Sequence, residues 1–377
     1  MIVVPRMAAP ALALAALGCS SGSGSPAGTR SDSGAPDVTL VDAGADADSG
    51  PADVSAGGDA GEASAEQDAE EAGGCVRSEV PDGSCVITLA TGQNAPSGLT
   101  VDSQYVYWTL GQAEGGVFRV PIGGGPVTTL ASGQAAPLSV AVDSSNVYWA
   151  NSGDGTVMSA PLDGGPPRTI VVAPSPPLCI AVDEANVYLT TQGGQVLSAP
   201  LGGVPEGAAP TVVASDQLQP GLVAVDDAGV YWTNYAGSAS IVSAPKSGVP
   251  EGGSPLVLAA NEDGPYGLAL DATHVYWTAI GNGSVRAAPK TGLPEGGTPT
   301  ILATGQATPA GVAVDSANAY FTSEIGAGAV LLVALPAGGM PFPLVSHQAY
   351  ASSIVVDGAN VYWTDLSSSG SVMQVAK

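Results

Sequence analysis

Basic residues are scarce in this chain. Its 377 residues include 9 Lys and Arg against 34 Asp and Glu, so the formal net charge is −25. A body this acidic repels phosphate backbones, and so few Lys and Arg residues form no basic stripe. The composition therefore excludes nucleic acid as a partner. Charged residues of both signs make up only 11% of the chain, which is too little for long amphipathic helices with a solvated face.

The apolar run near the start of the chain is short. It covers residues 7–17 and follows the basic residue Arg6. Its 11 residues are fewer than the about 20 that a membrane-spanning helix needs. A basic residue followed by a short apolar run is typical of a secretory signal peptide. We therefore predict a signal peptide over residues 1–18 and an exported protein.

The end of this segment, Leu17-Gly18-Cys19-Ser20-Ser21, resembles the lipobox of bacterial lipoprotein signal peptides. The resemblance implies cleavage before Cys19 and lipid attachment at Cys19. Because Ser follows the cysteine in place of Asp, it also implies sorting to the outer membrane or the cell surface of a Gram-negative bacterium. Ala16 departs from the family pattern, which usually has Leu there. Free secretion after an ordinary cleavage is the alternative.

Residues 19–74 are mostly Gly, Ser, Ala and Asp, without a single aromatic residue. Residues 20–74 hold 12 acidic residues and one basic residue, Arg30, which gives this stretch a charge of −11. Such a segment has too little apolar surface to offset the entropy of ordering. We predict a disordered acidic linker between the membrane and the following domain. We predict no cofactor, because the Asp spacing lacks the ordered pattern of a calcium loop; a structural Ca²⁺ is the alternative.

Cysteine is also rare, with 4 copies. Cys75 and Cys85 stand on either side of the junction between the linker and the domain that we assign to residues 75–377. In an exported protein we expect these two to form a disulfide. Cys179 lies in the apolar stretch 178–182 and is expected to be a small buried core residue. Pairing of Cys75 or Cys85 with Cys179 is the alternative.

Glycine and proline are abundant, with 52 and 31 copies, and from Cys85 onward they separate the units of a repeat. Each unit has an apolar strand that ends in Asp, a short turn, and a strand resembling Val-Tyr-Trp-Thr. These aspartates lie 41, 40, 43, 45, 44 and 42 residues apart, close to the period of a four-stranded propeller blade. They are Asp102, Asp143, Asp183, Asp226, Asp271, Asp315 and Asp357.

Counting the expected strands predicts how the ring closes. There are seven units with an aspartate and seven fourth strands, but the two series are out of phase. A fourth-type strand at 86–90 precedes the first unit, and the last unit stops after its third strand at 371–376. We predict that the N-terminal strand completes the last blade, which removes an exposed edge. The predicted fold class is all-β, a seven-bladed β-propeller with four-stranded blades.

The unit resembles the YWTD propellers of the LDL-receptor class, and NHL-type propellers share much of its pattern. The full phrase occurs once, at Tyr362-Trp363-Thr364-Asp365. That family usually has six blades, whereas this chain counts seven. The resemblance implies a propeller and no particular partner.

We interpret the repeated Tyr-Trp pair as packing. Neighbouring side chains of a strand point to opposite faces, so the pair fills the spaces on both sides of a blade. Leu189 and Phe321 replace Trp in two units, which fits a packing position better than a carbohydrate-stacking platform. Each repeated Asp is expected to accept backbone N–H bonds within its turn.

A propeller is expected to carry its function where the loops of several blades converge on the channel. By topology this face holds the loops between fourth and first strands and those between second and third strands. We predict a binding face made of polar and aromatic side chains in these loops, with ordinary solvated loop polarity as the alternative. The residues are Gln93, Gln134, Asn151, Asp154, Gln217, Asn234, Tyr235, Asn282, Glu324, His347 and Asp365.

Residue types that carry catalysis are few. The 2 histidines, His274 and His347, are expected on opposite faces, and zinc-type Cys/His spacings and phosphate loops are absent from the sequence. We therefore predict no catalytic residues and no metal site, and a protein that is not an enzyme but a binding module for an unknown protein or glycan partner. A purely structural envelope protein is one alternative. The other is a Ca²⁺- or Mg²⁺-dependent hydrolase or lyase that uses channel-facing carboxylates and amides, such as Glu324 and Asp365.

Overall fold

The computed structural model describes residues 75–76, 85–324, 328–348 and 350–377. These residues form strands joined by turns. Within this part of the chain, no helix has the length and hydrophobicity needed to cross a membrane. The signal peptide, the lipid site at Cys19 and the acidic linker lie outside the described residues and stay predictions.

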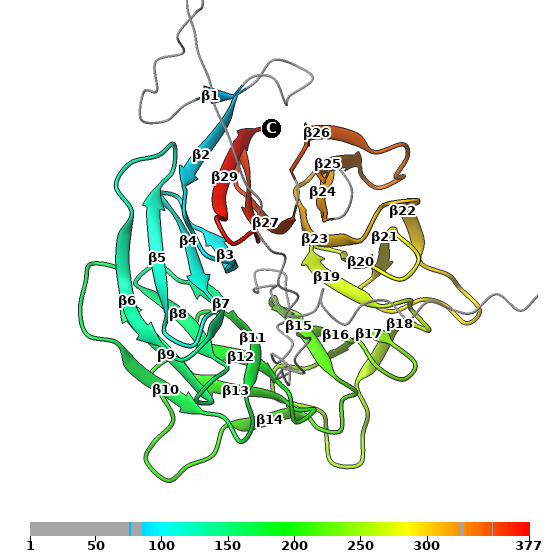
Figure 1. Cartoon of the computed structure of the whole chain (residues 1–377). Coiled ribbons are helices and arrows are strands. Elements are labelled where there is room, and N and C mark those ends of the chain that lie inside the picture. The colour runs from blue at the N-terminus through cyan, green and yellow to red at the C-terminus, as the bar shows by residue number, and fades with distance from the viewer. Residues whose placement is uncertain (1–74, 77–84, 325–327, 349) are drawn as a thin grey trace, which may run out of the picture.

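The described strands form seven antiparallel sheets, arranged as blades around a common centre (Figure 1). Six of these sheets take four strands in chain order, with the first strand innermost. Blade 1 holds β3 (Pro96–Val101), β4 (Tyr105–Leu110), β5 (Gly115–Pro121) and β6 (Thr128–Gln134). Blade 2 holds β7 (Pro137–Val142), β8 (Asn146–Asn151), β9 (Thr156–Pro161) and β10 (Arg168–Val172). Blade 3 holds β11 (Pro177–Val182), β12 (Asn186–Thr191), β13 (Val196–Pro200) and β14 (Thr211–Ala214).

The next three blades follow the same order. Blade 4 holds β15 (Pro220–Val225), β16 (Val230–Asn234), β17 (Ser240–Ala244) and β18 (Leu256–Ala260). Blade 5 holds β19 (Pro265–Leu270), β20 (His274–Ala279), β21 (Ser284–Pro289) and β22 (Thr300–Ala303). Blade 6 holds β23 (Pro309–Val314), β24 (Asn318–Ser323), β25 (Ala329–Ala334) and β26 (Phe342–Ser346).

Blade 7 closes the ring with strands from both ends of the described chain. It holds β27 (Ala351–Val356), β28 (Asn360–Asp365) and β29 (Ser371–Ala376), and its fourth strand is β2 (Val86–Ala90). β2 pairs antiparallel with β29, with Ile87 opposite Gln374. The seven-bladed propeller and its closure by the N-terminal strand are thus confirmed. A short fifth strand, β1 (Cys75–Val76), pairs with the outer side of β2 and was not expected.

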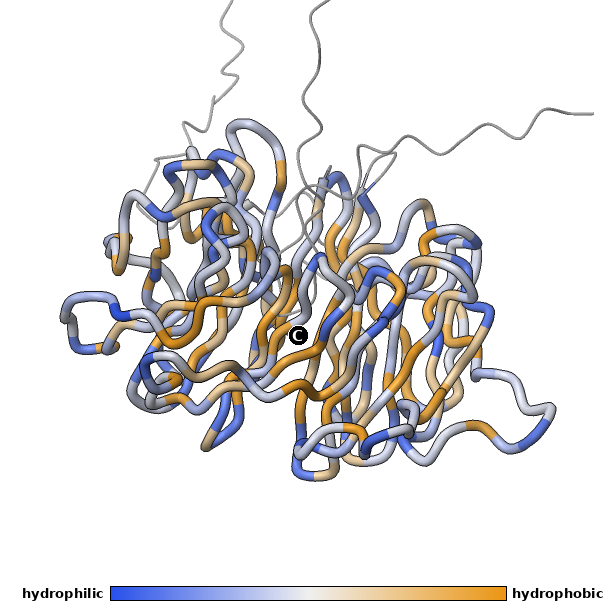
Figure 2. The backbone as a smooth tube through the Cα atoms, turned by 90° about the horizontal axis from the view of Figure 1, so that it is seen from below, coloured by the Kyte–Doolittle hydropathy of each residue, from blue (hydrophilic) through white to orange (hydrophobic). Residues whose placement is uncertain are grey.

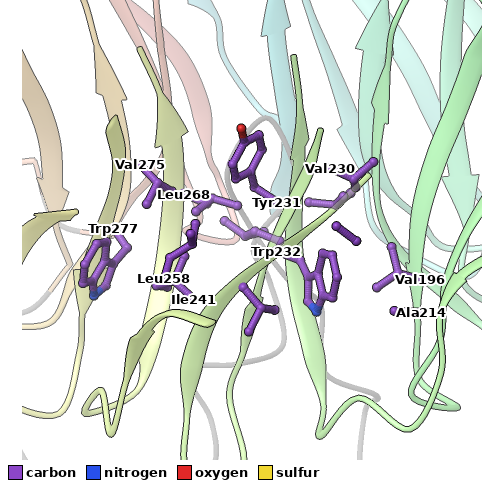
Figure 3. Close-up of a cluster of buried hydrophobic side chains, with 14 of the residues drawn as sticks. Val196, Ala214, Val230, Tyr231, Trp232, Ile241, Leu258, Leu268, Val275 and Trp277 are labelled. Carbon is purple, nitrogen blue, oxygen red and sulfur yellow. The ribbon is translucent and has the colours of Figure 1, made fainter. Parts of the chain in front are cut away.

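The Tyr-Trp pair fills the spaces between blades, as predicted. Tyr148 packs with Ile180 and Leu189 of blade 3, whereas its neighbour Trp149 packs with Tyr107 of blade 1. All these side chains are buried, and the five Trp residues are 0% exposed. Figure 3 shows the equivalent cluster of blades 3, 4 and 5, built around Trp232 and Trp277. The packing interpretation of the repeat is therefore confirmed.

The repeated Asp fixes its turn through both carboxylate oxygens. Oδ1 of Asp143 accepts the backbone N–H groups of Ser145 and Asn146, each at 2.7 Å. This confirms the predicted turn bonds. Oδ2 accepts the hydroxyl of Tyr148 at 2.7 Å, a bond that the sequence analysis did not predict. Figure 2 shows the resulting pattern along the chain, with hydrophobic stretches in the strands and hydrophilic residues at many of the turns.

The cysteines are described in part. Cys179 lies in β11 and is 1% exposed, so its predicted burial is confirmed. Neither Cys85 nor Cys179 is a free thiol. The side chain of Cys75 lies outside the described residues, and its pairing with Cys85 stays a prediction.

Candidate functional site

The glutamines of the predicted binding face, which lie at or just after a fourth strand, bind tryptophan side chains of the blade that follows. Nε1 of Trp149 donates to Oε1 of Gln134 at 2.8 Å. The same bond joins Trp108 to Gln93 at 2.9 Å and Trp232 to Gln217 at 3.1 Å. These bonds hold the loop before each first strand against the second strand of the same blade. The three glutamines therefore have a structural role.

Two further blades make this bond, which the sequence analysis missed. Trp363 donates to Gln348 at 3.1 Å, and Trp277 donates to a carboxylate, Glu262, at 2.9 Å. In all five described cases the acceptor lies 15 residues before the Trp. Where Leu189 replaces Trp, the residue 15 positions earlier is Pro174, which has no side-chain acceptor. This constant spacing is the sequence feature that predicts the bond.

Asn151 and Asn234 belong to the same internal network. Nδ2 of Asn151 donates to Oε1 of Gln134 at 3.1 Å, and Nδ2 of Asn234 donates to Oε1 of Gln217 at 3.1 Å. Asn151 is 2% exposed and Asn234 8%. Their position beneath the loops leaves little of either side chain available to a partner.

Other predicted site residues stabilise the turns between second and third strands. Asp154 accepts the backbone N–H of Thr156 at 3.0 Å, and Asp365 accepts that of Ser367 at 2.8 Å. Asn282 is exposed and accepts the hydroxyl of Ser284 at 2.6 Å. These contacts are the ones expected of ordinary turn residues.

The remaining predicted residues are Tyr235, His347 and Glu324. Tyr235 is partly buried, and burial, with the nearby charge of Asp263, raises the pKa of its phenol. His347 is exposed in the loop before β27. His274 begins β20 in a turn between first and second strands, at the other end of the blades from that loop. The two histidines thus lie apart, as expected.

Glu324 is held in place by the backbone of two blades. It directly follows β24, and its N–H donates to the carbonyl of Thr308 at 3.2 Å. Thr308 has φ 52°, a left-handed conformation that turns its carbonyl toward this N–H. The carbonyl of Glu324 accepts the N–H of Tyr350, from the loop that leads into β27, at 3.3 Å. Glu324 therefore sits where blades 6 and 7 meet, beside the innermost strands.

The carboxyl group of Glu324 is buried and incompletely bonded. Its Oε1 has no hydrogen-bond partner among the described residues, and neither has Oγ of Ser352 in β27, which is 0% exposed. Burial raises the pKa of Glu324 to about 7, although the neighbouring Ser352 hydroxyl lowers it in part. A carboxyl group in this environment changes its charge near neutral pH.

A small apolar cluster also lies near the innermost strands. Tyr266 of β19 and Ala310 of β23 are buried together, and Ile280 and Leu366 pack against them. Ile280 and Leu366 hold the position after the second strand in blades 5 and 7, which Glu324 holds in blade 6. The equivalent positions of blades 2, 3 and 4 carry Ser152, Gln192 and Tyr235. Among these residues, Glu324 is the acid whose pKa lies near neutrality.

A metal site is not evident from these side chains. In the part of the chain that the structure describes, no group of three or more His, Cys, Asp or Glu residues is placed to hold a metal ion. Glu324 and Asp365, which the sequence analysis considered as cation ligands, have different surroundings. Asp365 is bonded within its own turn, whereas Glu324 faces Ser352.

The chain matches no protein-family model. It also matches none of the curated proteins with which it was compared. Solved structures do resemble it. A streptogramin B lyase superposes with a TM-score of 0.62 at 15% identity, covering 77% of this chain and 96% of the lyase. Virginiamycin B lyase from Staphylococcus aureus gives 0.61 at 13% identity, covering 78% and 98% of the two chains.

A third structure is a catalytically inactive virginiamycin B lyase from Staphylococcus aureus with quinupristin. Its TM-score is 0.62 at 14% identity, with 78% of this chain and 98% of the lyase covered. These similarities establish the propeller fold.

They also correct one expectation. The prediction that this protein is not an enzyme is wrong, because the structures that its fold resembles at these scores are enzymes. Histidine counts and metal motifs do not detect a single buried carboxyl group such as that of Glu324, because its burial depends on the fold.

Proposed function

We propose that this protein is a lyase in which Glu324 removes a proton from a small-molecule substrate bound where blades 6 and 7 meet the channel. The observation that carries the proposal is the buried Oε1 of Glu324, which has no partner among the described residues. A buried polar atom without a hydrogen-bond partner destabilises the folded protein. Groups that destabilise the fold in this way are often found at functional sites. A substrate that donates a proton to this oxygen would remove the cost.

The chemistry of the two neighbouring groups suits an elimination. Glu324, with its pKa near 7, is partly ionised at neutral pH and serves as a base there. It takes a proton from the atom next to the breaking bond. The electron pair left behind forms a double bond, and the leaving group departs without the addition of water. We assign the neighbouring hydroxyl of Ser352 the role of donating a hydrogen bond to a substrate oxygen on which charge develops.

The fold likeness supports a first choice of substrate. The similar structures include a streptogramin B lyase and a virginiamycin B lyase with quinupristin. Streptogramin-type compounds are therefore the first class to test. The proposed step uses only Glu324 and Ser352 of this chain.

Incubation of the full chain with quinupristin, followed by mass spectrometry, tests the proposal. An elimination that opens a ring leaves the mass unchanged, whereas hydrolysis adds the mass of one water. We expect Glu324→Gln to lower kcat at least about 100-fold and Ser352→Ala to lower it less. Asp365→Asn, at a carboxylate bonded within its turn, should retain activity.

The pH profile gives a second readout. Wild-type activity should rise as the pH increases through about 7, when the Glu324 carboxyl ionises. A product heavier by one water would make the enzyme a hydrolase. Turnover that persists in Glu324→Gln would remove Glu324 from the reaction and with it the proposal.

We also propose, on sequence grounds, that the enzyme is exported and anchored through a lipid on Cys19. Growth of an expressing bacterium with labelled palmitate should label the wild-type chain, and Cys19→Ala should abolish the label. A label that survives Cys19→Ala would contradict the anchor. A protein or glycan partner stays a prediction, to be sought by cross-linking in membranes.

A further inference from the structure

The clearest departure from the repeat outside the Glu324 site is a charged pair in blade 5. Arg286 of β21 stands opposite Trp277 in the sheet. At this register the other described third strands have apolar residues, which are Phe118, Met158, Leu197, Val242, Leu331 and Met373. In the same blade, Glu262 stands where other tryptophans bind a glutamine. The two changes therefore occur together and compensate in charge.

This pair holds the guanidinium group in a defined position. Nη1 of Arg286 donates to Oε2 of Glu262 at 3.1 Å, and Nε donates to Oγ of Ser284 at 2.8 Å. The same Oε2 accepts Nε1 of Trp277 at 2.9 Å. The Glu262 side chain is 2% exposed and that of Arg286 19% exposed. None of the described residues accepts a hydrogen bond from Nη2 of Arg286, so the two N–H bonds of this atom remain available.

Stability alone gives no reason for this pair. Removing two charges from water carries a desolvation cost that their attraction often fails to recover. Blade 4 fills the equivalent positions with Gln217 and Val242, and its Trp232 is as well buried as Trp277. An ion pair is thus not needed to pack this part of a blade.

Arg286 lines a groove between blades 4 and 5. The groove has a volume of about 590 Å³ and lies between β18 and the loop that precedes β22. Its apolar lining includes Leu293 together with Val257 and Ile301, which are each 51% exposed. Asn261 and Thr298 add polar groups. Glu262, the ion-pair partner of Arg286, also lines the groove. The size and the mixture of apolar walls with a few polar and charged groups are typical of small-molecule sites.

The neighbouring groove between blades 3 and 4 is a natural comparison. It occupies the equivalent place, between β14 and the loop that precedes β18, and its volume is about 410 Å³. Its lining contains Asp216 and Glu251 and, within the described residues, no Lys or Arg. The guanidinium group is therefore a property of one groove and not of the repeat.

We propose that the groove between blades 4 and 5 binds an amphipathic organic carboxylate. The carboxylate accepts an N–H bond of Nη2 of Arg286, and the apolar body lies against Val257, Leu293 and Ile301. In a chain with net charge −25, an anion is attracted only where a cation is held locally, and Glu262 and Ser284 hold this one. The site is separate from Glu324 and independent of the proposed lyase activity.

Calorimetric titration of the full chain with octanoate and with octanamide tests the proposal, because the two probes differ in charge and share the apolar body. We expect octanoate to bind with 1:1 stoichiometry and octanamide to bind at least about tenfold more weakly, since charged hydrogen bonds are the stronger ones. The double variant Glu262→Gln/Arg286→Val gives blade 5 the residues of blade 4. It should lower octanoate affinity at least about tenfold and change octanamide binding less than about threefold.

A second variant covers the case in which the double variant does not fold. Ile301→Asp places a carboxylate on the half-exposed wall of the groove, where it disturbs no core residue, and it should abolish octanoate binding by repulsion. The proposal is overturned if octanoate does not bind at millimolar concentration, or if octanamide binds equally well. It is also overturned if the folded double variant or Ile301→Asp binds octanoate as wild type does.

Discussion

Trp277 donates its indole N–H to the carboxylate of Glu262, whereas Trp232 in the preceding blade donates to the amide of Gln217. Each acceptor comes from the loop that leads into the first strand of the blade that holds the tryptophan. The bond therefore ties that loop to the buried second strand, whatever the charge of the acceptor. Conservation of this geometry along the chain indicates that the glutamines stabilise the blades, and it separates them from the residues that carry chemistry.

Gln134→Leu tests the structural role of these glutamines. The change leaves Nε1 of Trp149 buried without its acceptor and removes one of the two acceptors of Nδ2 of Asn151. We expect the free energy of unfolding to fall by about 1–3 kcal/mol, measured by urea denaturation. Gln306→Leu is the matched control, because Gln306 lies 15 residues before Phe321 and its side chain, among the described residues, bonds only the carbonyl of Thr304. Equal losses in the two variants would contradict this role.

Acid should weaken the contacts between blades. Lys246 pairs with Asp183 at 2.9 Å and Lys377 pairs with Asp315 at 2.7 Å, each across a blade boundary. Burial acts to raise the pKa of Asp183, but the bonds from Lys246 and two backbone N–H groups outweigh it and lower this pKa to about 2. The pKa of Asp315 is lowered to about 2 in the same way, with Lys377 as the partner.

A carboxyl group whose pKa is lower in the folded state stabilises the fold above its unfolded pKa, here about 4, and loses this contribution as the pH falls toward 2. We therefore expect the free energy of unfolding to decrease between pH 4 and pH 2. Lys246→Met should make this decrease smaller. Urea denaturation at pH 6, 4 and 2.5 measures both, and pH curves of wild type and Lys246→Met that run parallel would refute the contribution of the pair.

Glu324 should affect stability in the opposite direction. Its pKa of about 7 lies above the usual 4.5 of a glutamate, so the protonated form is favoured in the folded state. Its contribution is complete below pH 4.5 and is lost as the pH rises through 7. Glu324→Gln stays neutral. It should therefore become more stable than wild type as the pH rises from 4.5 to 8, by on the order of 2–3 kcal/mol. A difference in unfolding free energy that is independent of pH would show that the carboxyl ionises normally.

Truncation tests the closure of the ring. A chain that begins at residue 75 keeps β1 and β2, and we expect it to melt at the same temperature as the full chain. A chain that begins at residue 91 loses β2, with its buried residues Val86 and Leu89, and exposes the edge of β29. We expect this deletion to cost about 5 kcal/mol or more, or to abolish cooperative melting. Equal melting of the two chains would mean that β2 does not close the ring.

The blade count and the closing strand could be predicted because they rest on local patterns. Alternation along a strand places Tyr148 and Trp149 on opposite faces, and the period between Asp143 and Asp183 measures one blade without any knowledge of the neighbours. The bond from Trp149 to Gln134 joins residues 15 positions apart across a loop and a strand. Its constant spacing is present in the sequence, but its meaning depends on how that loop folds back.

The candidate site depended on tertiary structure to a greater degree. Glu324 and Asp365 are both acids that follow or end a second strand, and the sequence offers no reason to distinguish them. In the folded chain Asp365 accepts a bond from its own turn, whereas Glu324 is enclosed by residues of other blades and retains an oxygen without a described partner. Arg286 and Glu262 likewise become a pair only when β21 and the loop before β19 meet.

The sequence alone determined the propeller, through periodicity that acts within each blade. Burial and charge pairing were decided only by the tertiary structure, because they depend on which blades meet around each side chain.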